Sequence, residues 1–302
     1  MPIFYCIQAQ KEKKWKYYLA MLQNQWKITK MENQVYKIEV PILEIPKHPK
    51  IQKWQEKRQE KKLLALLQEK QGRIVLSKKL KEKWKTLHRF QIEENFKLPL
   101  LYKILDFYLE AGKVGKQEVD LYFLCHTFSN ETVEIVKQLA KKYRSVNLVS
   151  DEITAYTKLA DKLYEQNAQL VTVSNNRKTA LKNAKLIMNY DFSKEEVLTY
   201  STNRESTIIH LQIRMNQIPI GFCKLVINDV VLGENGEDWD SLDTNMFTLD
   251  DMVASFLYWK KTREEKQELL ESLEISIQAL KGLNGVIHPN ELEKLARKLL
   301  TK

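Results

Sequence analysis

The middle of the chain alternates short apolar runs with amphipathic segments. The apolar runs are six to nine residues long, which is typical of strands that are covered on both faces of a sheet. The segments between them carry apolar residues at helical spacing. We predict strands and intervening helices in turn at 118–126, 129–143, 145–150, 151–166, 168–174, 175–184, 185–190, 193–200 and 206–213. This alternation predicts βαβ units, so we expect an α/β fold with a Rossmann-like, doubly wound parallel sheet.

The two flanks have a different pattern. Before the middle we predict strands at 3–9, 35–43 and 73–77 and helices at 13–26, 51–71, 78–90 and 98–112. After it we predict one or two strands in 218–229, an exposed acidic loop at 233–243, and helices at 247–261, 263–282 and 288–300. We therefore expect three regions: a basic α+β region (1–117), the Rossmann-like domain (118–232), and an acidic loop with C-terminal helices (233–302).

Composition narrows the class of protein. The chain has 302 residues, 43% of them hydrophobic and 29% charged, which is ordinary for a globular protein. It has no run of eighteen apolar residues, so a transmembrane helix is not expected. The apolar start comes before the first positive charges, the reverse of a secretory signal, so we expect a cytoplasmic location. Cys6, Cys125 and Cys223 lie in apolar runs with no CxxC pair, which predicts buried thiols rather than a zinc site or disulfides.

Positive charge is concentrated in the first third of the chain. Residues 1–117 contain 26 Lys and Arg against 12 Asp and Glu, a formal charge of +14, whereas residues 118–302 carry −4. Four of the six tryptophans lie in this basic region beside Lys or Arg: Trp15, Trp26, Trp54 and Trp84. Cations interleaved with aromatic rings suit a polyanion such as a nucleic acid, or an anionic membrane surface. The alternative is a solvated face, with lysines inflated by the base composition of an AT-rich, bacterial-type genome.

Candidate ligand-binding residues follow from the predicted parallel sheet. Ligands in such sheets bind beyond the carboxyl ends of the strands, where the strand order reverses. This rule selects residues after each of the first four strands: His126, Ser129, Asp151, Asn175, Asn176, Arg177 and Asp191. With a strand order of 3-2-1-4, His126, Ser129 and Asp191 would be neighbours. Several of these residue types are also common at helix N-termini, so capping is the alternative for Ser129, Asp151, Asn175 and Asn176.

Part of this pattern resembles a dinucleotide-binding Rossmann domain. Asp151 follows the second strand, about 25 residues after the first, where such domains place the acid that binds a ribose. The segment VSNNRKTA, followed by AKLIMNYD, resembles the sequences of shikimate-dehydrogenase-like proteins. In that family an Asn-Arg pair favours a phosphorylated cofactor, so the resemblance implies this role for Asn176 and Arg177. The first strand-to-helix turn, HTFSNE, departs from the family because it has no glycine to let a pyrophosphate approach the backbone. This departure, with Glu131 and Glu134 nearby, argues against standard NAD(P) binding.

Three functions remain open at this point. The first is binding or sensing of a small, nucleotide-like ligand at the strand ends. The second is an NADP-dependent oxidoreductase-like enzyme with an atypical cofactor loop. The third is a nucleic-acid-associated or scaffold protein that acts through residues 1–117. The sequence has no Walker loop, HExxH, GxSxG or paired metal ligands, so it assigns no catalytic residue, metal or specific cofactor.

Overall fold

The chain folds into two compact units, and each unit is built from two separate stretches of sequence. The computed structural model describes residues 1–9, 26–31, 34–42, 49–234 and 246–300. Unit 1 consists of Met1–Glu94 and Asn235–Glu274, and unit 2 consists of Asn95–Glu234 and Ile275–Lys302. No helix in the described part of the chain has both the length and the apolar composition that a bilayer crossing needs.

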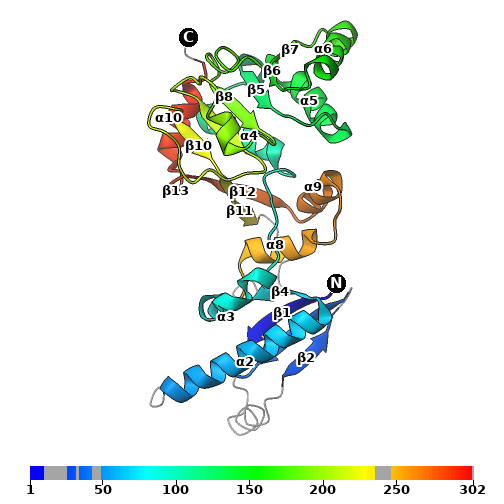
Figure 1. Cartoon of the computed structure of the whole chain (residues 1–302), viewed down its shortest axis with the longest axis vertical. Coiled ribbons are helices and arrows are strands. Elements are labelled where there is room, and N and C mark those ends of the chain that lie inside the picture. The colour runs from blue at the N-terminus through cyan, green and yellow to red at the C-terminus, as the bar shows by residue number, and fades with distance from the viewer. Residues whose placement is uncertain (10–25, 32–33, 43–48, 235–245, 301–302) are drawn as a thin grey trace. The chain divides into compact units, whose positions relative to one another are not determined.

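Unit 2 contains a six-stranded sheet in which every neighbouring pair of strands is parallel. Its strands are β5 (Asp120–Leu124), β6 (Ser145–Val149), β7 (Val171–Ser174), β8 (Leu186–Asn189), β9 (Thr207–His210) and β10 (Leu225–Ile227). They lie in the order β10-β9-β8-β5-β6-β7. Figure 1 labels five of them: β5, β6, β7, β8 and β10. The chain therefore winds outward from β5 through β6 to β7, returns to β8 and winds the other way. This order is that of a Rossmann-like sheet, and it confirms the predicted fold class.

Helices of unit 2 connect the strands or cover the sheet. They are α4 (Leu101–Gly112), α5 (Asn130–Lys142), α6 (Ile153–Asn167), the short α7 (Lys194–Val197) and α10 (Pro289–Arg297), with a 3-10 turn η2 (Lys116–Glu118) before β5. The apolar stripe of α5 includes the buried side chains of Ile135 and Leu139, as amphipathic spacing requires. α4 and α10 pack so closely that a Cβ at Gly112 would lie 2.6 Å from the Cβ of Ala296. A side chain at this position would therefore force the two helices apart.

Two predicted helices of this region are wrong. Residues 175–184 form consecutive turns, because the Asn176 side chain accepts a hydrogen bond from the Lys178 amide at 3.0 Å and competes with helical bonding. The predicted helix 263–282 is two elements: α9 (Arg263–Ser272) ends before Glu274, whose φ is 52°, and β12 (Ile275–Gly282) follows. β12 pairs with β11 (Asp229–Glu234) and β13 (Gly285–Val286) in an antiparallel sheet.

Unit 1 contains a four-stranded sheet in the order β2-β3-β1-β4. Its elements are β1 (Ile3–Gln8), β2 (Lys27–Lys30), β3 (Val35–Val40), α2 (Pro49–Lys70), β4 (Arg73–Leu76), α3 (Lys78–Lys83), η1 (Lys85–Phe90), α8 (Leu249–Leu257) and α9. β1 is parallel to β3 and β4, and β2 is antiparallel to β3. The buried face of α2, with Leu63 and Leu67, packs on this sheet together with Trp84. The predicted helix 78–90 is interrupted at Trp84, where 3-10 turns begin.

The two units divide the chain differently from the three expected ranges. Residues 235–274 belong with the N-terminal stretch because α8 contributes Ser255 and Asp251, which bond to Tyr5 and Lys81. Residues 95–117 belong with the Rossmann-like sheet because Tyr108 Oη bonds Thr207 Oγ1 of β9 at 2.7 Å. Most of the predicted helix 13–26 and of the predicted acidic loop 233–243 lies outside the described residues.

Candidate functional site

The carboxyl ends of β5 and β8 are adjacent at the point where the strand order reverses. The loop after β8 places Asp191 against the loop after β5. Its Oδ1 accepts a hydrogen bond from the His126 amide at 2.7 Å, and its Oδ2 accepts from the Thr127 amide at 3.0 Å and the Thr127 hydroxyl at 2.8 Å. The strand order therefore brings His126 and Asp191 together, as the 3-2-1-4 arrangement implies. Ser129 has no such contact with Asp191 and instead begins α5.

The position of Asp191 matters because backbone amides at this turn are the usual anion-binding groups of the fold. Here an internal carboxylate accepts from two successive amides. Glu131 adds further negative charge in the first turn of α5, where its Oε2 accepts from Tyr190 Oη at 3.0 Å. The β5–α5 turn is therefore already supplied with anionic groups by the chain itself.

His126 is the centre of a small ionisable cluster at this edge. Its Nδ1 lies 3.2 Å from Asp151 Oδ2, and its Nε2 lies 3.1 Å from Glu196 Oε1. The Nε2 contact lacks hydrogen-bond geometry, so this buried atom has no aligned partner. The imidazole stacks on Phe192, with ring centroids 3.8 Å apart and 9° between the planes. The segments after β6, β5 and β8 thus contribute one ionisable side chain each: Asp151 and His126 from loops and Glu196 from α7.

The cluster is open to solvent on its carboxylate side. The Asp151 side chain is 69% exposed, that of Glu196 is 45% exposed and that of His126 is 31% exposed. Hydrogen bonds from Ser193, and more weakly the nearby His126, hold the pKa of Glu196 below its ordinary value. Both carboxylates can therefore accept hydrogen bonds from a ligand while the imidazole stays fixed against Phe192.

The loop that carries Asp191 and Phe192 is held by a buried amide. Asn189 Oδ1 accepts from the Phe192 amide at 3.0 Å, and its Nδ2 donates to the Phe192 carbonyl at 2.8 Å and to His210 Nδ1 at 2.9 Å. Burial, reinforced by the charge of Lys97, lowers the pKa of His210 to about 3, so its imidazole is neutral. Asn189 and His210 are therefore buried residues that hold the loop with Asp191 and Phe192 in place.

Tyr200 lies beside the candidate site, and the sequence reasoning did not select it. It is buried beside Phe192, with ring centroids 6.0 Å apart. Burial raises the pKa of its phenol, and the charges of Asp151, Arg177 and Glu196 all act on it. Arg177 is thereby linked to the same edge, where its carbonyl also accepts from the Ser201 amide at 2.9 Å. A tyrosine at the end of a short helix gives no sequence signal, since it reads as ordinary core.

The remaining predicted site residues have separate roles. Ser129 caps α5, accepting from the Thr132 amide at 3.2 Å. Asp151 does not cap α6, because Glu152 occupies the cap position and makes no side-chain cap bond. Asn175 and Asn176 are exposed in the turn after β7, a strand at the edge of the sheet.

Cys125 is a buried thiol beside the candidate site. Burial raises the pKa of Cys125 to about 12, which removes the thiolate that a nucleophile requires. Its Sγ lies 3.1 Å from the Thr127 carbonyl and 3.2 Å from Tyr156 Oη. All three cysteines are buried and unpaired, as expected. The described residues include no group of three or more His, Cys, Asp or Glu side chains suited to a metal ion.

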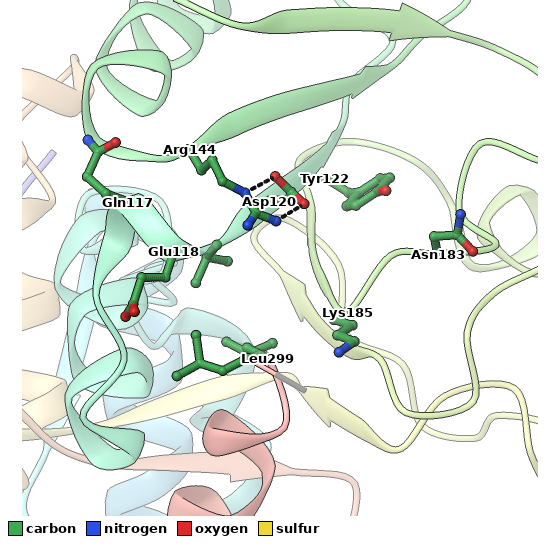
Figure 2. A pocket seen from close by; sticks show the side chains of 10 residues that line it. Gln117, Glu118, Asp120, Tyr122, Arg144, Asn183, Lys185 and Leu299 are labelled. Carbon is green, nitrogen blue, oxygen red and sulfur yellow. Dashed lines mark hydrogen bonds and ion pairs between the residues drawn. The ribbon is translucent and has the colours of Figure 1, made fainter. Parts of the chain in front are cut away.

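A pocket of ≈ 570 Å³ lies at the opposite, amino-terminal edge of the same sheet. Figure 2 shows Arg144 and Asp120 facing each other in it, with Tyr122, Asn183 and Lys185 on the far side. Arg144 Nε donates to Asp120 Oδ1 at 2.9 Å, and Lys185 Nζ donates to the Lys298 carbonyl at 3.1 Å. The sequence rule looked only at carboxyl ends, so it could not select this pocket. The charged side chains of Arg144, Asp120 and Lys185 are thus engaged by the chain itself.

Comparison with known proteins finds a structural neighbour and no match to a protein family. No protein-family model matches the chain, and no curated protein matches it. Among solved structures, it is similar to a crystal structure of shikimate dehydrogenase in complex with NADP+, with 8% sequence identity and a TM-score of 0.31 over 100% of this chain and 96% of that chain. A likeness of this size carries no argument about function, and the fold class rests on the strand order itself.

Proposed function

We propose that this protein binds a small, nucleotide-like ligand at the carboxyl edge of the six-stranded sheet. The observation that carries the proposal is the cluster of His126, Asp151 and Glu196, three partly exposed ionisable side chains from the segments that follow β5, β6 and β8, near the reversal of strand order. In this fold class, ligands bind at that place.

The geometry favours particular contacts. The Asp151 carboxylate is the most exposed acceptor of the cluster and suits the vicinal hydroxyls of a ribose. Arg177 is exposed in the turn after β7, and its carbonyl accepts from the Ser201 amide at 2.9 Å, so its guanidinium suits a phosphate attached near that ribose. The β5–α5 turn does not suit a pyrophosphate, because Asp191 already accepts from its two amides. The proposed ligand is therefore a ribonucleotide recognised through its ribose and a phosphate close to it.

The same features explain why we do not extend the proposal to hydride transfer. An NADP-dependent oxidoreductase holds its pyrophosphate on the amides of the first turn. Here those amides donate to Asp191, and the turn contains no glycine. Fluorescence titration with NADPH tests this alternative directly, and we expect no saturable binding.

A thermal-shift panel tests the proposal. We expect adenosine 5′-monophosphate, which keeps both vicinal ribose hydroxyls and has a single phosphate on the same ribose, to raise the melting temperature more than ADP or inorganic pyrophosphate. A ligand present at a hundred times its dissociation constant adds about 2.7 kcal/mol to the free energy of unfolding. No shift with any member of a broad ribonucleotide panel would contradict the proposal.

Two variants locate the site. Asp151→Asn and Arg177→Gln should each weaken binding about tenfold, since each removes one charge-assisted contact. Asp161→Asn and Lys178→Gln are matched controls, because both side chains are exposed on or beside the same elements. Equal losses in variants and controls would place the ligand elsewhere.

A further inference from the structure

The outward face of α2 in unit 1 is a cationic surface. α2 is a 22-residue helix with seven Lys and Arg and three Glu. Its inward face, marked by Gln55, Gln59, Leu63 and Leu67, is buried. At 100° per residue, the opposite face carries exposed basic side chains along most of the helix: Lys50, Lys53, Lys57, Arg58 and Lys61.

The acidic residues of α2 do not neutralise this surface. Glu56 is bonded by Lys83 Nζ at 2.8 Å, and Glu60 accepts from the Thr86 hydroxyl. Both therefore face α3 and η1 rather than the cationic surface. Glu69 lies at the far end of the helix, 3.0 Å from Lys70. The charges of α2 are thus sorted between its faces, which random lysine enrichment would not produce.

An aromatic ring lies within this cationic surface. Trp54 is 61% exposed, and the Arg58 guanidinium lies 5.6 Å from its ring centroid. The other tryptophans of the basic region differ: Trp84 is buried, and Trp26 packs on α2 by donating to Gln59 at 2.6 Å. Trp15 lies outside the described residues. Only Trp54, among the described members of this group, exposes most of its surface.

We propose that the cationic surface of α2 binds single-stranded nucleic acid. The lysines and Arg58 contact successive phosphates, and Trp54 stacks on an unpaired base. This combination of a basic track and an exposed aromatic ring is how sequence-independent single-strand binders work. The inference is separate from the proposed ligand site, because it uses residues of unit 1 alone.

An anionic membrane fits the surface less well. Interfacial helices insert an apolar face into the lipid boundary. The apolar face of α2 is buried against its own sheet, and the large apolar side chains exposed on the outward face are Ile51 and Trp54. Two side chains cannot supply an insertion face, so charge complementarity is left as the driving force.

The test is fluorescence anisotropy with the full chain and a labelled oligothymidylate at several salt concentrations. The variant Lys50→Gln/Lys57→Gln/Lys61→Gln should lose at least tenfold in affinity at low salt. Each lost phosphate contact lowers the slope of log affinity against log salt by about 0.7, so the slope should fall by about 2. The matched control, Lys158→Gln/Lys162→Gln/Lys182→Gln, removes the same charge from exposed positions of unit 2 and should change affinity less than twofold.

Trp54→Ala separates stacking from charge. It should weaken oligothymidylate binding about tenfold and leave a duplex of equal length unaffected, because paired bases present no free face. Failure of the wild-type chain to bind oligothymidylate at low salt overturns the proposal. Equal losses in the two triple variants also overturn it, as does tighter binding to phosphatidylserine vesicles than to oligothymidylate.

Discussion

Both units contain mainly parallel sheets, yet they distribute charged and polar groups in opposite ways. In unit 2, acids and donors at the strand ends bond to one another, as Asp191 does with His126 and Thr127. In unit 1, Glu56 and Glu60 of α2 bond to side chains of α3 and η1, and the basic residues of the helix remain on its exposed face. Polar groups that bond to one another hold the loops of a site in one conformation. A surface with an excess of one charge instead attracts an oppositely charged partner at long range. The difference suggests small-molecule recognition in unit 2 and polyanion recognition in unit 1.

The largest expected effect on the free energy of unfolding comes from the buried tryptophan of unit 1, in contrast to the exposed one. Trp84 is 1% exposed within the core, so Trp84→Ala should lower the free energy of unfolding by about 3–5 kcal/mol. Trp54→Ala should change it by less than about 0.5 kcal/mol, since most of the ring is in water. Urea unfolding followed by far-ultraviolet circular dichroism measures both. A large loss in Trp54→Ala would show that Trp54 supports the fold rather than a partner surface.

The next effect concerns the buried amide of unit 2. Asn189→Ala removes the partner of the Phe192 amide, the Phe192 carbonyl and His210 Nδ1. Buried groups left without partners should lower the free energy of unfolding by about 3 kcal/mol. Asn183→Ala, at an exposed position just before β8, is the control and should be close to neutral. If both variants have the same free energy of unfolding, the hydrogen bonds of Asn189 do not stabilise the loop after β8.

A third effect depends on pH. An unfolded histidine takes up a proton as the pH falls below its ordinary value of 6.5, whereas folded His210 does so only near its lowered pKa of about 3. The unfolded state therefore binds more protons in this window, and stability falls as the pH falls. Between pH 7 and pH 5, the wild-type chain should lose about 2 kcal/mol more than His210→Gln. The free energy of unfolding is measured for both chains by urea titration at the two pH values. If the wild-type chain and His210→Gln lose the same amount, His210 is not neutral and buried.

The smallest effect tests whether Asp191 substitutes for a bound anion. Asp191→Ala should lower the free energy of unfolding by about 1.5 kcal/mol, because two amides and a hydroxyl lose a charged acceptor. Added phosphate should restore part of this loss in the variant and leave the wild-type chain unchanged. A variant that gains nothing from phosphate would mean that the turn cannot bind an anion at all.

The sequence predicted the Rossmann-like sheet because most of its apolar runs are buried strands, as β8 and β9 are along their whole length, and therefore carry a strong local signal. It failed at 263–282, where LLESLEISIQALKG contains both helical and alternating spacing, and the positive φ of Glu274 decides the boundary. It also could not anticipate that residues 246–274 pack with the N-terminal stretch, since Tyr5 and Ser255 are 250 positions apart.

Part of the candidate site could also be predicted from the sequence. The strand-end rule selected His126, Asp151 and Asp191 because sheet geometry fixes where those residues lie. It missed Glu196 and Tyr200, which follow a turn whose path depends on the buried contacts of Asn189 and Phe192. The rule also could not show that Asp191 would bond to the β5–α5 turn instead of facing a ligand.

The interleaving of the two units bears on how the chain matures on the ribosome. Tyr5 of β1 emerges early, but Phe247 and Ser255, which pack against it and bond to it, emerge about 240–250 residues later. At a synthesis rate of about 10 residues per second, β1 waits roughly 25 seconds for them. During that interval one side of the first sheet is uncovered, and a nascent chain paused near Glu234 would expose incomplete cores of both units to chaperones and proteases.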